Sequence, residues 1–190
     1  MFKQAGGTLR ARQARTAGVH PRTLTAMMDS GMVERLSRGV YQLADAPRIS
    51  DPDLVVAAIK APAGVVCLIS ALALHEMTTQ IPHHVDLALP PGARAPRLDH
   101  PPVRFYRFGG RSMMEGIEQR RIGRITVRVF SPAKTVADCF KFRNKIGTDV
   151  AAESLRNYLR RRGSNVDELV RFADIDRVRS IMRPYIEATL

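Results

Sequence analysis

The fold is decided near the start of the chain by residues 8–43, which read TLRARQARTAGVHPRTLTAMMDSG and then MVERLSRGVYQL. Small helix-forming residues recur at Ala11, Ala14 and Ala17, and Gly18 can end that helix in a left-handed cap. Pro21 suits the first turn of a second helix, because its missing N–H has no partner there. The pattern predicts one helix between Thr8 and Gly18 and another from Pro21 to about residue 30.

A hairpin is expected directly after the second helix. Residues 32–36 and 40–43 alternate between apolar and polar side chains around the turn at Ser37-Arg38-Gly39. Two helices followed by a basic hairpin are typical of a winged helix-turn-helix, in which the second helix enters the major groove and the hairpin lies against the phosphate backbone. The alternative is an ordinary helical hairpin followed by a β-hairpin, with its arginines merely solvated.

The spacing along the second helix separates a buried from an exposed set of side chains. Leu24, Met27 and Met28 recur at three and four residues and are expected to pack inward. The exposed candidates for contact with base edges are Arg22, Thr23, Thr25 and Ala26. The candidates for contact with phosphates are Arg10, Arg12, Arg15, Arg35 and Arg38. Tyr41 is expected either to pack beneath the hairpin or to hydrogen-bond a phosphate.

The charge of the chain favours a polyanion as partner. The sequence has 30 Lys and Arg against 18 Asp and Glu, a formal net charge of +12 and a pI near 10.8. Nucleic acid is the obvious class, and double-stranded DNA fits the hairpin pattern. A membrane is not expected as partner, because the most apolar stretch, residues 63–74, is well short of the ~20 residues that a spanning helix needs. The N-terminus lacks the features of a secretory signal, so the cytoplasm is the expected location.

The two cysteines are expected to be structural. Cys67 and Cys139 both lie in apolar helical contexts, with no metal-ligand spacing around them. Such cysteines usually pack as small hydrophobic side chains. No disulfide is predicted.

A proline-rich segment, residues 46–52 (APRISDP), predicts a boundary between a winged-helix domain at 1–46 and a second domain at 50–190. Apolar spacing in the second part predicts helices at 53–60 and 70–77, then strands at 85–89, 103–108 and 124–130. Ser131 is expected to cap a helix that runs to Phe142, and further helices are expected at 149–162, 165–172 and 176–188. The predicted fold is therefore α+β, with a small mainly antiparallel sheet and a helical C-terminal run.

Two further basic regions are candidates for secondary contacts with the DNA backbone. Residues 94–128 carry nine arginines against three acidic residues, and among them Arg104 and Arg107 alternate with aromatic side chains. On a strand, such alternation more often means one apolar and one solvated face. The other region is the cluster of Arg156, Arg160, Arg161 and Arg162 at a predicted helix end, of which the first three are the candidates, and there the helix dipole alone would explain the positive charge.

The sequence supports a metal site or a catalytic function less well than it supports DNA binding. The best metal constellation combines His75 and Glu76 with the pair at 83–84 and Asp86, but adjacent helical residues point about 100° apart, and no zinc pattern occurs. No nucleotide-binding fingerprint is present either, so no metal, cofactor or enzyme activity is expected. Asp138, three residues before Lys141, is expected to form a local ion pair or backbone contact that stabilises the fold.

The chain resembles the AbiEi-type antitoxins, which are regulators in bacterial phage-defence loci. The resemblance in the N-terminal part is carried by Gly6-Gly7, Leu9 to Arg12, Ala17 to Val19, Pro21 to Leu24, Gly31 and Arg38 to Tyr41. In the second part, residues 70–75 (SALALH) and 131–147 (SPAKTVADCFKFRNKIG) resemble helical segments of that family in matching order.

The resemblance implies a transcriptional autorepressor of a type IV toxin–antitoxin pair. Its partner gene would encode a nucleotidyltransferase-like toxin, and its own promoter would carry inverted repeats. Two other functional classes stay open. One is an interaction protein whose second domain binds the toxin, and the other is a small metal-dependent nuclease or transferase. No heptad pattern indicates a dimer interface, so we expect a monomer that binds paired sites.

Overall fold

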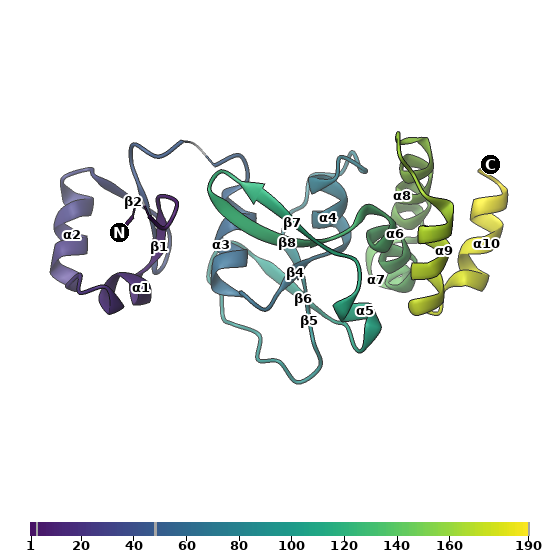
Figure 1. Ribbon diagram of the computed structural model, residues 1–190, viewed down its shortest axis with the longest axis horizontal. Helices are drawn as coiled ribbons and strands as arrows, with labels where there is room; N and C mark the ends of the chain where they lie inside the picture. Colours follow the sequence, from purple (N-terminus) through teal and green to yellow (C-terminus); the bar gives the residue numbers. More distant parts are fainter. Residues whose placement is uncertain (3, 48, 190) are drawn as a thin grey trace.

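The computed structural model describes residues 1–2, 4–47 and 49–189. Lys3, which counts toward the positive charge of the N-terminal region, Arg48 in the predicted boundary segment, and Leu190 lie outside the described residues. The molecule is elongated, with the N-terminal elements at one end, a twisted sheet in the middle and a group of helices at the other end (Figure 1).

The N-terminal part is a small winged helix. Its elements are β1 (Thr8–Arg10), α1 (Ala11–Thr16), α2 (Pro21–Asp29), β2 (Val33–Ser37) and β3 (Val40–Leu43). The three strands form an antiparallel sheet in the order β1-β3-β2. The prediction of a first helix from Thr8 was wrong for residues 8–10, because these pair with β3 and their backbone hydrogen bonds therefore go to the sheet. A separate core holds this part together, made of Phe2, Leu9, Ala14, Leu24 and Val33.

A five-stranded sheet occupies the middle of the molecule. Its strands are β4 (Val65–Val66), β5 (Val85–Leu89), β6 (Val103–Arg107), β7 (Ile117–Ile122) and β8 (Ile125–Phe130), in the order β6-β5-β4-β8-β7. β4 and β7 were not predicted. The β4–β5 and β7–β8 pairs are antiparallel, whereas β4–β8 and β5–β6 are parallel. The sheet is thus mixed, where a mainly antiparallel one was expected. The long connection at residues 90–102 lets β6 return parallel to β5, and alternation within a strand carries no information about its direction.

Helices cover both faces of this sheet. On one face lie α3 (Pro52–Lys60) and a core that includes Leu54, Val66 and Val127. On the other face the core includes Phe108, Phe130 and Phe140 and extends into the C-terminal helices. The side chains of β4 show this division, since Val65 belongs to the second of these cores and Val66 to the first, as the period of two requires. The remaining short helices of this region are α4 (Leu68–Leu74) and α5 (Arg111–Met114).

The C-terminal run is helical, as expected. It comprises α6 (Pro132–Lys141), α7 (Arg143–Ile146), α8 (Thr148–Arg160), α9 (Val166–Ile175) and α10 (Arg179–Glu187). The predicted cap on α6 is present, since the Ser131 side chain accepts a hydrogen bond from the backbone N–H of Lys134. Both cysteines are buried in the core, which confirms the prediction that they pack as small hydrophobic side chains. Within the described residues, no helix combines the length and apolarity needed to cross a membrane.

Candidate nucleic-acid interface

Helix α2 presents a short polar face at one end of the molecule. Its N-terminus is fixed by His20, whose Nδ1 accepts a hydrogen bond from the backbone N–H of Arg22 at 3.2 Å. Pro21 occupies the first helical position, as predicted. Leu24 turns into the core, which leaves the other side chains of the first two turns exposed: Arg22, Thr23, Thr25 and Ala26. The Thr25 hydroxyl donates to the carbonyl of Pro21 at 3.2 Å, so an incoming ligand meets its methyl group and oxygen lone pairs.

The arginines of β1 and α1 differ in access. Arg12 and Arg15 are exposed on α1. Arg10 is half-buried at the end of β1, where its backbone N–H donates to Oε1 of Gln13 at 2.9 Å. Burial, together with the charge of Arg12, lowers the pKa of Arg10. Arg12 and Arg15 are therefore the more accessible cations of this segment.

The hairpin β2–β3, called the wing from here on (residues 33–43), carries the two other predicted arginines. Arg35 is exposed on β2 and lies opposite Tyr41 in the antiparallel register. Tyr41 is half-buried against the core of the winged helix, which favours the packing role that was one of its two expected roles. Arg38 is at the tip, with its side chain 80% exposed and its Nη1 3.8 Å from Oδ2 of Asp99.

The tip of the wing is not free, a feature that the sequence did not predict. Ser37 is buried, and its hydroxyl donates to the carbonyl of His100 at 2.7 Å. Lys60, at the end of α3, donates in turn to the Ser37 hydroxyl at 3.0 Å. These partners lie 23 and 63 positions away in the sequence, so no local pattern could have indicated them. The wing is thus docked on the C-terminal part of the molecule.

The second basic region lies away from α2, on the strand β6. Arg104 and Arg107 are both exposed, and Arg107 donates through Nη1 to the carbonyls of Pro90 and Ala93 at 3.0 and 2.7 Å. The neighbouring Tyr106 and Phe108 are buried in the core. Their rings face protein neighbours and offer no stacking surface, so the alternation marks a packed strand.

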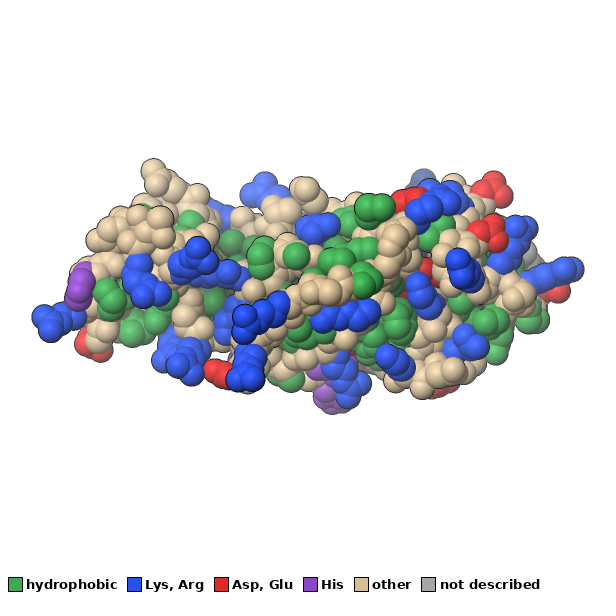
Figure 2. Space-filling model, turned by 90° about the horizontal axis from the view of Figure 1, so that it is seen from below, with side chains coloured by type: hydrophobic (Ala, Val, Ile, Leu, Met, Phe, Trp, Pro, Cys, Tyr) green, Lys and Arg blue, Asp and Glu red, His purple; other side chains and the backbone are tan. Residues whose placement is uncertain are grey.

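The third basic region lies at the end of α8, beyond the sheet. Arg156 and Arg160 are exposed, and Arg161 is half-buried with one guanidinium nitrogen enclosed. Arg160 lies in the last turn of the helix, where a positive charge interacts favourably with the dipole. Lysines and arginines are spread along most of the face seen in Figure 2, and few acidic side chains interrupt them.

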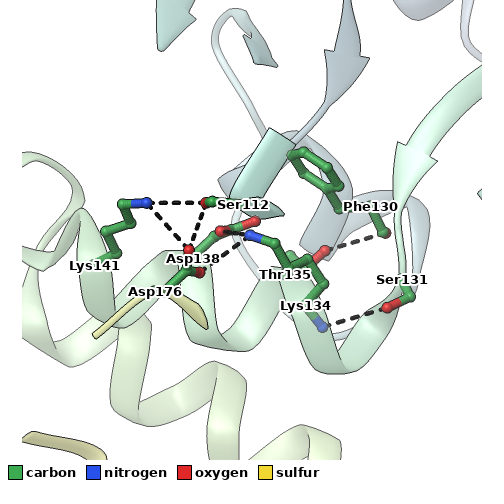
Figure 3. A network of polar contacts seen from close by, with 8 residues as sticks. All are labelled: Ser112, Phe130, Ser131, Lys134, Thr135, Asp138, Lys141 and Asp176. Atoms are coloured by element: carbon green, nitrogen blue, oxygen red, sulfur yellow. Dashed lines mark hydrogen bonds and ion pairs between the residues drawn. The ribbon is translucent and has the colours of Figure 1, made fainter. Parts of the chain in front are cut away.

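Asp138 belongs to a buried polar network rather than to an open site (Figure 3). Its ion-pair partner is Lys134, one turn earlier, and not Lys141 as expected; Lys141 pairs with Asp176 at 3.1 Å. Lys134 also pairs with Asp176 at 3.1 Å, and the side chains of these three buried residues, Lys134, Asp138 and Asp176, have no exposed surface. These three side chains therefore lie in the core, whereas Lys141 at the edge of the network is partly exposed.

The two carboxylates of this network differ in acidity. Burial raises the pKa of Asp138 well above its usual range, although the ammonium of Lys134 opposes this. Burial acts in the same direction on Asp176, but hydrogen bonds and the charges of Lys134 and Lys141 outweigh it and hold its pKa low. Ser112 supplies one of these hydrogen bonds, donating to Oδ1 of Asp176 at 2.5 Å.

The histidines weighed as metal ligands serve separate local contacts. His75 is buried, and its Nε2 lies 2.7 Å from the carbonyl oxygen of Phe130. Nε2 of His84 lies 2.9 Å from Oδ1 of Asp86. His83 and Glu76 are exposed. Across the part of the chain that the structure describes, no group of three or more His, Cys, Asp or Glu residues is arranged to hold a metal ion.

A model of a known protein family matches the N-terminal part of the chain. Residues 2–44 match the family model described as the transcriptional regulator AbiEi antitoxin. The match covers β1 to β3 and thus the complete winged helix, here called the AbiEi segment. It supports a regulator role for this segment.

The fold of nearly the whole chain has a structural counterpart. The crystal structure of the RV2827C protein from Mycobacterium tuberculosis superposes with a TM-score of 0.54 at 14% sequence identity, covering 95% of this chain and 75% of that chain. The likeness therefore includes the AbiEi segment and the C-terminal part, and at this identity it concerns the fold alone. The comparison with curated protein sequences gave no match.

Proposed function

We propose that this protein is a sequence-specific DNA-binding repressor that acts as the antitoxin and autoregulator of a type IV toxin–antitoxin operon. The observation that carries the proposal is the exposed polar face of α2 beside a basic wing, within a segment that matches AbiEi regulators. In this proposal residues 1–46 form the DNA-binding domain and residues 50–190 the antitoxin domain.

The roles of the side chains follow from their positions. Arg22 at the start of α2 can reach a base edge, and guanine is the usual partner of arginine in the major groove. Thr23, Thr25 and Ala26 present hydroxyl and methyl groups suited to neighbouring bases. Phosphate contacts fall to the arginines around them: Arg10, Arg12, Arg15, Arg35 and Arg38. Arg104, Arg107 and the arginines of α8 would serve only if the DNA extends beyond the wing.

The testing experiment is a titration of the protein on ~200 bp of DNA from upstream of its own gene and on scrambled DNA, at several salt concentrations. A specificity ratio of ~10³ or more supports an operator-reading repressor and justifies footprinting for inverted repeats. Equal, steeply salt-dependent binding to both DNAs would show that the positive net charge binds any nucleic acid without regard to its sequence.

A second candidate is an antitoxin that acts through its C-terminal part on a nucleotidyltransferase-like toxin. The exposed apolar side chains of this part, Ile81 at 82% and Met114 at 71%, are the first positions at which to test such a contact. Co-purification of the toxin with the full chain after nuclease treatment would support direct contact. Loss of the toxin from the complex on nuclease treatment would leave DNA as the link between them.

A further inference from the structure

Lys60 of the C-terminal part lies at the base of the wing. It is the last residue of α3 and is half-buried, and its Nζ is 3.0 Å from the hydroxyl of Ser37. The loop whose His100 carbonyl accepts the hydrogen bond from Ser37 is itself tied to α3, since Nε2 of His100 lies 3.4 Å from Oδ1 of Asp53. The ammonium group is therefore held in a defined position beside the wing.

Positive charge accumulates around this lysine. Burial lowers the pKa of Lys60, and the nearby charges of Arg10, Arg35 and Arg38 lower it further. Asp99, which pairs with Arg38, is the acidic group that opposes them. The strand register places Arg10 and Ser37 on either side of Val40, and Lys60 contacts Ser37 while Arg38 pairs with Asp99, so the four cations share the junction of β1, the wing and α3. Their mutual repulsion costs stability, and an anion that bridges them would remove that cost.

We infer that Lys60 extends the DNA-backbone surface of the wing, so that the winged helix and the C-terminal part bind the phosphates as one body. This inference rests on the DNA-binding function proposed above and adds a residue from outside the AbiEi segment to it. Lysine acts as a point charge on phosphate, which suits an ammonium that already donates one hydrogen bond to Ser37 and keeps two N–H groups for a ligand.

A purely structural role is the competing explanation, because lysine in the last turn of a helix is favoured by the dipole and its bond to Ser37 ties the two parts together. The two explanations differ in what salt should do. A phosphate contact contributes to the salt dependence of binding to any DNA, whereas a tie between protein parts does not.

The test is a salt-dependent DNA titration of the full-length protein and three variants. Lys60→Met removes the charge and keeps the apolar stem. Ser37→Ala removes the hydrogen bonds of Ser37 to Lys60 and to the carbonyl of His100 and leaves the charge of Lys60. Lys145→Met is the matched control, because it makes the same exchange at an exposed lysine of α7, among the C-terminal helices.

We expect Lys60→Met to weaken binding to upstream and scrambled DNA alike, by roughly eightfold at 0.1 M salt, and to flatten the salt slope by about 0.9. Ser37→Ala and Lys145→Met should bind like the wild type. Unchanged binding by Lys60→Met overturns the inference, and so does an equal loss in Lys60→Met and Ser37→Ala with an unchanged slope.

A second variant tests the inference from the opposite direction. Asp99→Asn removes the acidic group from the cluster and should raise the affinity for all DNA several-fold, with no loss of folding because Asp99 is exposed. Unchanged affinity in this variant contradicts the inference even if Lys60→Met fails to fold. Absence of any DNA binding by the wild type refutes instead the function on which the inference rests.

Discussion

Gly6 lies so close to Arg124 that a Cβ atom on the glycine would be 2.8 Å from the Cβ of that arginine. Arg124 stands in the turn between β7 and β8, so the N-terminal residues contact the tip of this hairpin directly. Gly6 also has a φ of +75°, a conformation that side chains disfavour. The contact explains why a glycine is needed at this point of the AbiEi segment.

Gly6→Ala should lower the free energy of unfolding by ~1–3 kcal/mol, through the combined cost of its φ angle and the close contact with Arg124. Urea unfolding measures the change. Gly18→Ala is the matched control, because Gly18 has a φ of +84° but open space around it, and should lose only about 1 kcal/mol. If Arg124→Gly fails to restore part of the stability of Gly6→Ala, the contact is not the cause.

Asp138→Ala should destabilise the protein by ~3–5 kcal/mol, because it removes one partner from a buried ion pair and leaves Lys134 with Asp176 alone. The melting temperature measures this loss. The double variant Lys134→Met/Asp138→Leu should recover part of it, since replacing both members of a buried pair by apolar side chains is often nearly neutral and Asp176 keeps Lys141 and Ser112 as partners. A folded Asp138→Ala variant with the melting temperature of the wild type would contradict the structural role.

Arg22→Ala and Arg38→Ala should affect DNA binding differently. The first should cost ~1–3 kcal/mol mainly on the preferred site, because Arg22 begins the helix assigned to the major groove. The second should weaken binding to all DNA alike, because Arg38 is at the exposed tip of the wing. Titrations on upstream and scrambled DNA measure both effects, and equal losses on both DNAs in both variants would undo the assignment.

His75 should make the fold sensitive to acid. Burial lowers the pKa of His75, while its hydrogen bond to the carbonyl of Phe130 opposes this only in part. In the unfolded chain the imidazole takes up its proton near pH 6.5. The stability that neutral His75 provides is therefore present above pH 6.5 and is lost as the pH falls toward the lower pKa of the folded state, by up to ~1.4 kcal/mol per pH unit.

Urea midpoints at pH 7.5, 6.5 and 5.5 measure this dependence. His75→Gln keeps a donor for the carbonyl and should lose less stability than the wild type over the same interval. His83→Gln serves as the control, because His83 is exposed and the variant should follow the wild type. Identical pH profiles for wild type and His75→Gln would exclude His75 as the source.

The sequence by itself determined those helices and strands whose start, stop or alternation signals lie within their own residues. The residues that start and stop its helices act on their own neighbours: Pro21 and Gly31 bound α2, and Ser131 caps α6. The alternation of the wing and of β5 and β8 likewise depends only on the period of a strand. For that reason the winged helix, the exposed face of α2 and the helical C-terminal run could be predicted.

Only the tertiary structure decided how these elements meet. β4 is two residues long and β7 is dominated by polar side chains, so neither shows the alternation that would have predicted it, and the order and direction of the strands depend on connections rather than on pattern. Lys134 contacts Asp176, which lies 42 residues further along the chain, and Ser37 contacts His100, which lies 63 residues further along. Such pairs depend on where packed surfaces bring distant side chains together, because a single long-range contact leaves no periodic trace in the sequence.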